Sequence, residues 1–274
     1  MEGPISGPTA VRFGIRPATL WCMSDAATVS ARPLTAAARA VEARKVYGGG
    51  DSEVRALDGI SVEFEAGRFT AIMGPSGSGK STLMHCMAGL DSLTEGEVSI
   101  GSTSLAGLSD KDLTMLRRTQ IGFIFQAFNL IPTLNAYETI VLPLSLDGAT
   151  GDGAWIDSVI NTIGLRDRLD HRPSELSGGQ QQRVAVARAL ASKPAIIFAD
   201  EPTGNLDSRT GGEVLGFMRR AVTDLGQTIV MVTHDAVAAS YADRIVFLKD
   251  GKLAGEMVSP TPDKVLDFLK HLGE

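Results

Sequence analysis

The sequence predicts an α/β fold in which a parallel sheet is covered by helices on both faces. Short apolar stretches of strand length alternate with stretches of helical spacing on either side of a long central segment. These strands are apolar along most of their length, as expected of strands that are buried on both faces. The central segment, from residue 135 to about residue 190, has helical spacing almost throughout. It indicates a helical subdomain inserted between two parts of the sheet.

The individual elements follow from local composition. Strands are expected at residues 60–65, 69–73, 98–100 and 121–125, and again at 195–199, 229–232, 245–248 and 252–257. A helix is expected after Lys80, at residues 82–89, and an amphipathic helix at 263–272. Breaks at residues 147–153 and 172–179 divide the central segment into separate helices.

Composition limits the classes of function. The 274 residues include 43% hydrophobic and 21% charged side chains, an ordinary balance for a globular protein. A net charge of −6 disfavours nucleic acid as a partner, because proteins that bind its phosphate backbone usually carry clustered Lys and Arg. Cys22 and Cys86 form no CxxC pair, which favours a reducing compartment such as the cytoplasm. No apolar run approaches the about 20 residues of a membrane-spanning helix, so a membrane function is expected to come from a partner.

The first 39 residues are expected to be a disordered extension. They are rich in Ala, Thr, Pro, Gly and Arg and lack apolar periodicity. They contain no apolar core of the kind a signal peptide needs. Met23 is an alternative to Met1 as the translational start, and the sequence assigns this extension no role.

The most informative segment is Gly-Pro-Ser-Gly-Ser-Gly-Lys-Ser at residues 74–81, between a predicted strand and a predicted helix. Pattern and position match a phosphate-binding loop, also called Walker A. The glycines allow backbone N–H groups to point at phosphates, Lys80 adds a positive charge, and the Ser81 hydroxyl can reach Mg²⁺. An accidental Gly/Ser-rich turn is the alternative, which the strand and helix on either side disfavour. The residues expected to bind nucleotide here are Gly74, Pro75, Ser76, Gly77, Ser78, Gly79, Lys80, Ser81 and Thr82.

A second candidate element is the carboxylate pair Asp200 and Glu201, at the end of the apolar strand 195–199. Asp200 is placed to hold Mg²⁺, and Glu201 to polarise an attacking water. An acidic pair after a strand is by itself as often a solvated loop. Together with a phosphate-binding loop, it predicts a nucleoside triphosphatase.

The family is indicated by Leu-Ser-Gly-Gly-Gln at residues 176–180, followed by Gln-Gln-Arg-Val-Ala-Val-Ala-Arg-Ala-Leu. This segment resembles the signature sequence of ABC ATPases almost residue for residue. Ser177, Gly178, Gly179 and Gln180 would form an anion seat at a helix N-terminus, aimed at a γ-phosphate. The simpler interpretation, Ser177 as an ordinary N-cap, is compatible with it.

The resemblance implies that two subunits meet head to tail, with each ATP between one phosphate loop and the other subunit's signature. Residues 200–207 resemble the D-loop that crosses this interface. Tyr47 resembles the A-loop residue that stacks on adenine, although a Tyr at a strand end is more often simple packing. Gln126 resembles the Q-loop glutamine that reaches Mg²⁺ and water. His234 resembles the switch histidine that contacts the γ-phosphate, whereas an isolated His would be given a structural role.

The sequence-based assignment is therefore an α/β P-loop NTPase fold of the ABC ATPase type, with a mixed sheet core, an antiparallel β subdomain and an inserted helical subdomain. The nucleotide-binding domain is placed at residues 40–258, its helical subdomain at about 127–190, and a C-terminal helix at 259–274. The expected cofactors are ATP and Mg²⁺. Glu201, His234 and Gln126 are the expected catalytic residues, and Ser81, Gln126 and Asp200 the expected metal ligands.

Within the family, residues 128–143, 171–176 and 200–209 look like those of the lipoprotein-releasing and macrolide-efflux group. The resemblance implies a separate permease with four transmembrane helices and an extracytoplasmic domain, to which ATP cycles transmit mechanical movement. The protein would then work on the cytoplasmic side of the cell membrane, peripheral to the permease. The apolar stretch 130–146 would include the groove for the permease, or would simply be core packing of the helical subdomain.

Other classes fit less well. ABC ATPases of DNA repair carry long heptad insertions or zinc clusters, and translation-type relatives carry two ATPase domains in one chain. This sequence has none of these features. A non-catalytic module would have a degenerate Glu201 or His234, and both are intact. The forty residues after His234 are too few for the regulatory β-domain of sugar or methionine importers. The substrate, the direction of transport, and the choice between a homodimer and a pair with a sister ATPase stay open.

Overall fold

The computed structural model describes residues 1, 3, 36–49, 52–146, 148 and 151–273. The disordered extension expected at residues 1–39 thus lies almost entirely outside the described residues. Its predicted boundary needs correction, because the first strand, β1 (Ala36–Tyr47), begins four residues before Ala40.

The larger sheet has six strands in the order β10-β9-β3-β8-β7-β6. Its members are β3 (Phe69–Met73), β6 (Ile121–Phe125), β7 (Ile196–Asp200), β8 (Ile229–Val232), β9 (Arg244–Lys249) and β10 (Lys252–Val258). The pairs from β9 to β6 are parallel, and β10 pairs antiparallel with β9 at one edge. Parallel strands place their carboxyl ends along one edge, where ligands bind in open α/β sheets.

The smaller sheet is antiparallel, in the order β2-β1-β4-β5. It contains β1, β2 (Val54–Glu65), β4 (Glu95–Ile100) and β5 (Thr103–Ser104). The mixed core and the antiparallel β subdomain predicted from the sequence are both present.

β1 was not predicted because alanine and charged residues dominate it, whereas strands usually favour β-branched and aromatic residues. Ala38 and Ala40 are buried, and then the alternation shifts at a bulge, where Glu42 has φ 47°. Beyond the bulge, Ala43 and Lys45 are the buried side chains. The bulge breaks the period of two on which a sequence-based strand assignment depends.

The two sheets are joined through α1 (Lys80–Met87), the helix that follows the phosphate loop. Its buried Leu83 and Met87 belong to one hydrophobic cluster with Phe64 of β2 and Phe198 of β7. The helix is therefore packed between the antiparallel sheet and one face of the larger sheet.

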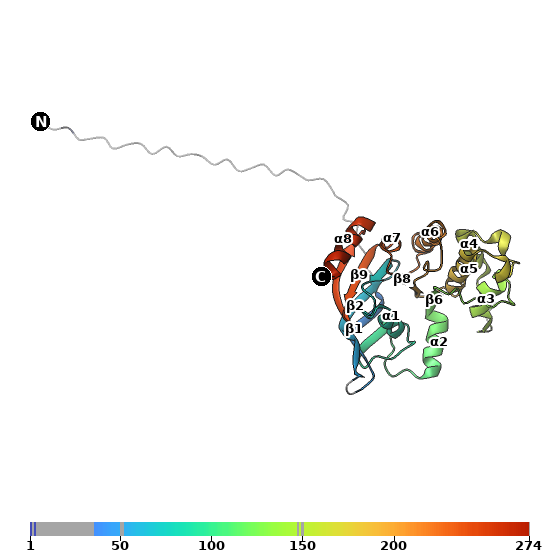
Figure 1. Cartoon of the computed structure of the whole chain (residues 1–274), viewed down its shortest axis with the longest axis horizontal. Coiled ribbons are helices and arrows are strands. Elements are labelled where there is room, and N and C mark those ends of the chain that lie inside the picture. Colours follow the sequence, from blue (N-terminus) through green and yellow to red (C-terminus); the bar gives the residue numbers. More distant parts are fainter. Residues whose placement is uncertain (2, 4–35, 50–51, 147, 149–150, 274) are drawn as a thin grey trace. The chain divides into compact units, whose positions relative to one another are not determined.

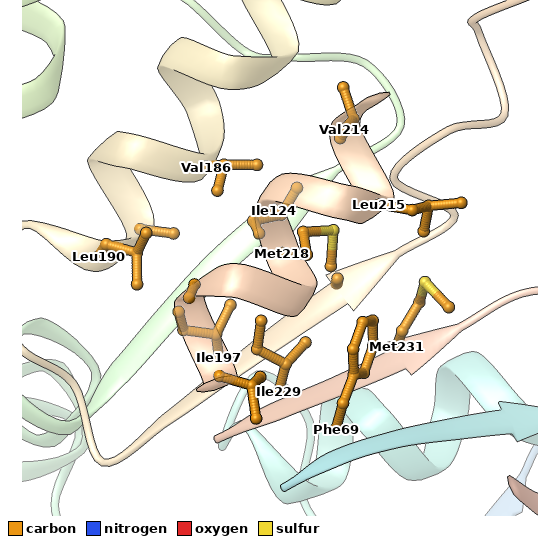
Figure 2. Packing of buried hydrophobic residues seen from close by; sticks show 14 of the residues in the cluster. Phe69, Ile124, Val186, Leu190, Ile197, Val214, Leu215, Met218, Ile229 and Met231 are labelled. Carbon is orange, nitrogen blue, oxygen red and sulfur yellow. The ribbon is translucent and has the colours of Figure 1, made fainter. Parts of the chain in front are cut away.

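The opposite face of the larger sheet is covered mainly by α6 (Ser208–Leu225). In Figure 2, Leu215 and Met218 of this helix lie over Phe69, Ile197, Ile229 and Met231 of the strands. Burial of both faces explains why the strands are apolar throughout.

The inserted segment forms three helices that lie beside α6 and away from the antiparallel sheet (Figure 1). They are α3 (Ala136–Leu146), α4 (Gly153–Ile163) and α5 (Gly178–Leu190), with short 3₁₀ turns at Arg166–Arg168 and Pro173–Glu175. Asp152 caps the start of α4 by accepting the N–H groups of Ala154 and Trp155.

Three further helices complete the described elements. They are α2 (Asp110–Gln120), α7 (Ala236–Ala239) and α8 (Pro262–Gly273). α2 was not expected, since only Leu116 of its eleven residues is buried. None of the helices in the described part of the chain has both the length and the apolar character needed to cross a bilayer.

Replacing Phe198 by alanine should lower the free energy of unfolding by about 3 to 5 kcal/mol, because the side chain is fully buried between α1 and the sheet. Val258→Ala is the matched control: its side chain is 72% exposed, and the change should cost less than about 0.5 kcal/mol. Denaturant unfolding followed by circular dichroism measures both. Equal losses for the two variants would contradict the assigned core.

Candidate active site

The phosphate loop connects β3 to α1 by a path that only glycine can follow at two positions. Gly74 has φ 151° and Gly79 has φ 96°. A Cβ at Gly74 would lie 2.0 Å from the carbonyl oxygen of Leu248, and one at Gly79 would lie 2.3 Å from that of Ala56. The loop is thus held directly against the backbone of two neighbouring segments.

Lys80 lies at the start of α1 and turns back into the loop. Its ammonium donates hydrogen bonds to the carbonyl oxygens of Gly74 (3.0 Å) and Pro75 (2.7 Å). Burial lowers the pKa of Lys80, and the charges of Glu201 and Asp200 oppose this effect. The loop, its lysine and the carboxylate pair therefore form one electrostatic site. Ser81 and Thr82 follow in the first turn of the helix.

Asp200 is the last residue of β7, two strands away from β3 across β8. Burial raises the pKa of Asp200, with His85 and Lys80 acting in the opposite direction and Glu201 adding to the rise. His85 was not singled out from the sequence, because only the packing of α1 brings it near Asp200. A carboxylate that burial destabilises is well prepared to receive a cation.

Glu201 adopts the left-handed region with φ 44°, which is costly for a residue other than glycine. Its carboxylate Oε1 lies 2.8 Å from Nδ1 of His234, which follows β8. The backbone N–H of Glu201 donates to the carbonyl of Val232 at 2.9 Å. The structure thus brings together the two residues expected to position the attacking water.

The donor set suits Mg²⁺ held jointly by protein and nucleotide. In the part of the chain that the structure describes, no group of three or more His, Cys, Asp and Glu side chains could hold a metal alone. Mg²⁺ usually takes only one or two carboxylates and completes its shell with phosphate oxygens and water. Asp200 and Ser81 provide oxygen ligands of this kind.

Gln126 directly follows β6 and is held by a reciprocal pair of hydrogen bonds. Its Nε2 donates to Oδ1 of Asn205 at 3.0 Å, and Nδ2 of Asn205 donates to the Gln126 carbonyl at 3.0 Å. A Cβ at Gly204 would lie 2.6 Å from the Gln126 side-chain nitrogen. This partnership with residues 204–205 was not visible in the sequence, since 79 residues separate the two amides.

The signature residues form a cap at the start of α5. Oγ of Ser177 accepts the N–H of Gln180 at 3.3 Å, and Oε1 of Gln180 accepts the N–H of Ser177 at 2.8 Å. A Cβ at Gly179 would lie 2.2 Å from the methyl of Thr210 in α6, and Gly178 lies beside Leu206. The simpler interpretation of Ser177 as an N-cap is therefore correct, and its exposed position is compatible with an anion seat as well.

Gln182, in the same helix, was missed by sequence reasoning although it is fully buried. Its side-chain amide donates to the carbonyl of Phe125, next to Gln126, at 3.2 Å, and to that of Pro202, next to Glu201, at 2.5 Å. One side chain thus ties the signature helix to both neighbours of the expected catalytic residues.

Tyr47 ends β1 and is 41% exposed as a residue. Its hydroxyl donates to Asp91 at 2.7 Å. Tyr47 lies on the antiparallel sheet. The other expected site residues lie on or next to the larger sheet and its helices.

Comparison with known proteins agrees with this geometry. The family model described as "ABC transporter" matches residues 57–204. A macrolide export ATP-binding/permease protein of Bdellovibrio bacteriovorus is 46% identical over 215 residues, which are 78% of this chain but only 33% of that protein. An uncharacterised ABC transporter ATP-binding protein of Methanocaldococcus jannaschii is 46% identical over 213 residues, 76% of this chain and 94% of that protein.

A solved structure is similar as well. It is a dimeric, post-hydrolysis state of the ATP-binding cassette MJ0796, also from M. jannaschii, bound to ADP and phosphate. It has a TM-score of 0.72 and 41% identity, and covers 82% of this chain and 99% of that one.

The chain belongs to the ABC transporter family. It is an ATP-binding cassette with the fold of the ABC ATPases, and the family, fold and enzyme class predicted from the sequence are thereby confirmed. The roles of the individual residues stay predictions.

Asp200→Asn should raise the thermal stability of the nucleotide-free protein at neutral pH while abolishing Mg²⁺-dependent hydrolysis. The pKa of Asp200 is raised in the folded protein, so stability falls as pH rises from the unfolded-state pKa through the folded-state pKa. The gain from asparagine should therefore be complete above that range and shrink below it.

Thermal unfolding of the two proteins over a series of pH values measures this difference. Asp243→Asn is the control and should lower the thermal stability. The Asp243 carboxylate accepts the N–H of Phe69 at 2.9 Å and pairs with Arg219 at 2.8 Å, so its charge stabilises the fold. A loss of stability in Asp200→Asn would refute the assignment.

Proposed function

We propose that this chain binds and hydrolyses ATP at two sites shared between two cassettes, and that closure of this dimer drives a separate membrane permease. The observation that carries the proposal is the 2.8 Å contact of Glu201 with His234 beside the glycine-built phosphate loop. It joins a nucleotide cradle to a pair of groups that can position water.

The expected residues divide the work at the γ-phosphate. Lys80 and the N–H groups of the loop neutralise and orient the phosphates. Glu201 accepts a hydrogen bond from the attacking water, and its contact with His234 fixes the direction of the carboxylate. Catalysis of this kind depends on positioning and charge stabilisation.

Mg²⁺, held by Ser81, Asp200 and Gln126, would neutralise charge on the phosphate oxygens. The Gln126 side chain does not act alone, because it is hydrogen-bonded to Asn205. We therefore assign Gln126 and Asn205 to the metal side of the site as one unit.

The second half of each site comes from the signature of the other subunit. Ser177 and Gln180 are hydrogen-bonded to each other at the exposed start of α5, which supports an anion seat that the single chain could offer to a partner. The similar cassette MJ0796 is a dimer. The motif set of one chain is sufficient for a homodimer, and a sister ATPase with the same motifs would serve equally.

A permease needs a docking place, and the structure offers a groove beside Gln126. A cavity of about 300 Å³ is lined by Phe123 and Phe125 of β6, Asn129, Pro143 of α3, Arg118 and Arg188. The stretch 130–146 expected to hold the groove contributes only Pro143; the rest comes from β6, α2 and α5, with Asn129 and Ser192 from the adjoining loops. Aromatic and cationic walls suit an apolar segment that carries an acidic residue.

Similarity to a macrolide export ATP-binding/permease protein supports a permease of the export type. The segments 128–143, 171–176 and 200–209 resemble the lipoprotein-releasing and macrolide-efflux group, and on that resemblance we expect a permease with four helices, an extracytoplasmic domain and a mechanical use of ATP. The cassette would then sit on the cytoplasmic face of the cell membrane. Nucleic acid has no place in this assignment.

Glu201→Gln should keep ATP binding but reduce kcat by about 100-fold or more, because the amide cannot accept the proton of the water. An ATP-bound dimer should accumulate and be visible by size-exclusion chromatography. The control is Glu213→Gln, an exposed carboxylate on α6 that pairs with Arg183 outside the site. Full turnover in Glu201→Gln would show that another group activates the water.

Asn129→Cys, in a background without Cys22 and Cys86, should form a cross-link to the permease in membranes of the native host. Asn129 is exposed and lines the groove. Lys252→Cys, exposed on β10, is the control and should form none. Equal cross-linking from both positions, or from Lys252→Cys alone, would move the docking site away from the groove.

A further inference from the structure

We propose that Asp91 and Lys45 form a positioning site that fixes the Tyr47 ring for adenine and so sets the affinity of the protein for ATP. The proposal rests on the proposed ATP site and extends it to residues that no motif marks. Tyr47 needs such a device, because it is an exposed residue at the end of a strand.

The first contact is at the hydroxyl. Tyr47 donates to Oδ2 of Asp91 at 2.7 Å, while Oδ1 of the same carboxylate accepts from Nζ of Lys45 at 2.6 Å. The carboxylate is itself fixed, because Oδ1 also accepts the N–H of Ser92 at 2.8 Å. The Asp91 carboxylate thus binds the side chains of both Lys45 and Tyr47 in β1.

The second contact is at the ring. The Lys45 ammonium lies 4.8 Å from the centroid of the Tyr47 ring, within the range of a cation–π interaction. Lys45 is 9% exposed and also donates to the carbonyl of Ser92 at 2.7 Å, so its position is well determined. The Lys45 ammonium lies over the ring and Asp91 holds the hydroxyl. These two contacts together fix the orientation of the Tyr47 ring.

The charges agree with this arrangement. Burial is the largest single effect and tends to lower the pKa of Lys45, but the hydrogen bond to Asp91 and the charge of that carboxylate, with smaller contributions from neighbouring groups, together raise the pKa. Burial tends to raise the pKa of Asp91, and the hydrogen bonds from Lys45 and Tyr47 lower it overall. The hydrogen bond to Asp91 is the main cause of a raised pKa at Tyr47, which keeps the phenol protonated as a donor.

The same contacts tie the ring to the phosphate loop. Asp91 follows α1, and its N–H donates to the carbonyl of His85 in that helix at 3.3 Å. At the other end of α1, the Thr82 side chain also interacts with the Tyr47 phenol. Because α1 begins at Lys80, the distance between the adenine platform and the phosphate cradle is fixed by one helix.

This geometry predicts which ligands depend on the Tyr47 contacts for their affinity. A base stacks on an aromatic face whatever its hydrogen-bonding pattern, so the site should strengthen binding of the nucleoside part as a whole. The phosphates are bound by the loop itself. Loss of the Asp91 contact should therefore weaken ATP but leave a ligand without a base unaffected.

The test compares ATP with inorganic tripolyphosphate in the purified, intact chain. In Asp91→Asn and in Tyr47→Phe, KM for ATP should rise about tenfold, as expected for losing a hydrogen bond to a charged group, with kcat changed less than about twofold. The inhibition constant of tripolyphosphate should not change. The double variant should bind ATP no more weakly than Asp91→Asn alone, because the hydrogen bond that Tyr47→Phe removes is one of those that Asp91→Asn already disturbs.

Glu95→Gln is the matched control, since this carboxylate on the neighbouring strand pairs with Arg44 at 2.9 Å and does not reach Tyr47. Its KM should equal that of the unmodified protein. Tyr47→Phe keeps the ring, so it tests the contact even where Asp91→Asn fails to fold.

Two outcomes distinguish a failure of this proposal from a failure of the assignment of Tyr47 to adenine binding. If Tyr47→Ala leaves KM for ATP unchanged, Tyr47 does not bind adenine and that part of the ATP site is wrong. If Tyr47→Ala raises KM but Tyr47→Phe and Asp91→Asn do not, the ring binds ATP without a positioning site. A parallel rise in the tripolyphosphate constant would overturn the proposal too, by showing that Asp91 acts on the phosphate loop.

Discussion

The structure depends first on the close approach of the phosphate loop to two backbone carbonyls. The Cα atoms of Gly74 and Gly79 face the carbonyls of Leu248 in β9 and Ala56 in β2, at distances that exclude any Cβ. Those two carbonyls belong to different sheets. The loop is therefore a junction, and the larger sheet, the antiparallel sheet and α1 must all be in place before Lys80 can take its position. A backbone carbonyl cannot move aside as a flexible side chain can, so this junction is rigid.

A second set of contacts links the catalytic loops to each other. Gln182 donates to the carbonyls of Phe125 and Pro202. The Gln126 side chain donates to that of Asn205, which in turn donates to the backbone carbonyl of Gln126. The signature helix therefore cannot move without displacing the neighbours of Gln126 and Glu201. In the proposed dimer, where the signature would contact the other subunit's nucleotide, these contacts give a direct path from the signature to the chain's own site.

Sequence reasoning predicted the elements whose residues carry a fixed local pattern. The strands of the larger sheet, the phosphate loop and the capped start of α5 are of this kind. It did not predict β1, because the bulge at Glu42 breaks the alternation, or α2, whose surface is nearly all polar. The missed site residues, Asn205, Gln182 and Asp91, act through partners 79, 57 and 44 positions away. Such pairs are set by tertiary packing, and no local spacing records them.

The strand order also has a consequence for biosynthesis. β3, which leads into the phosphate loop, lies between β8 and β9, and the carboxylate of Asp243 accepts its first N–H across 174 positions of the chain. A ribosome delivers the loop long before these partners. During translation, then, β3 is made before either of the strands that pair with it, and its pairing is complete only after β9 has emerged. A truncated product that ends before residue 243 therefore lacks both the strand that pairs with one edge of β3 and the Asp243 carboxylate that accepts the N–H of Phe69.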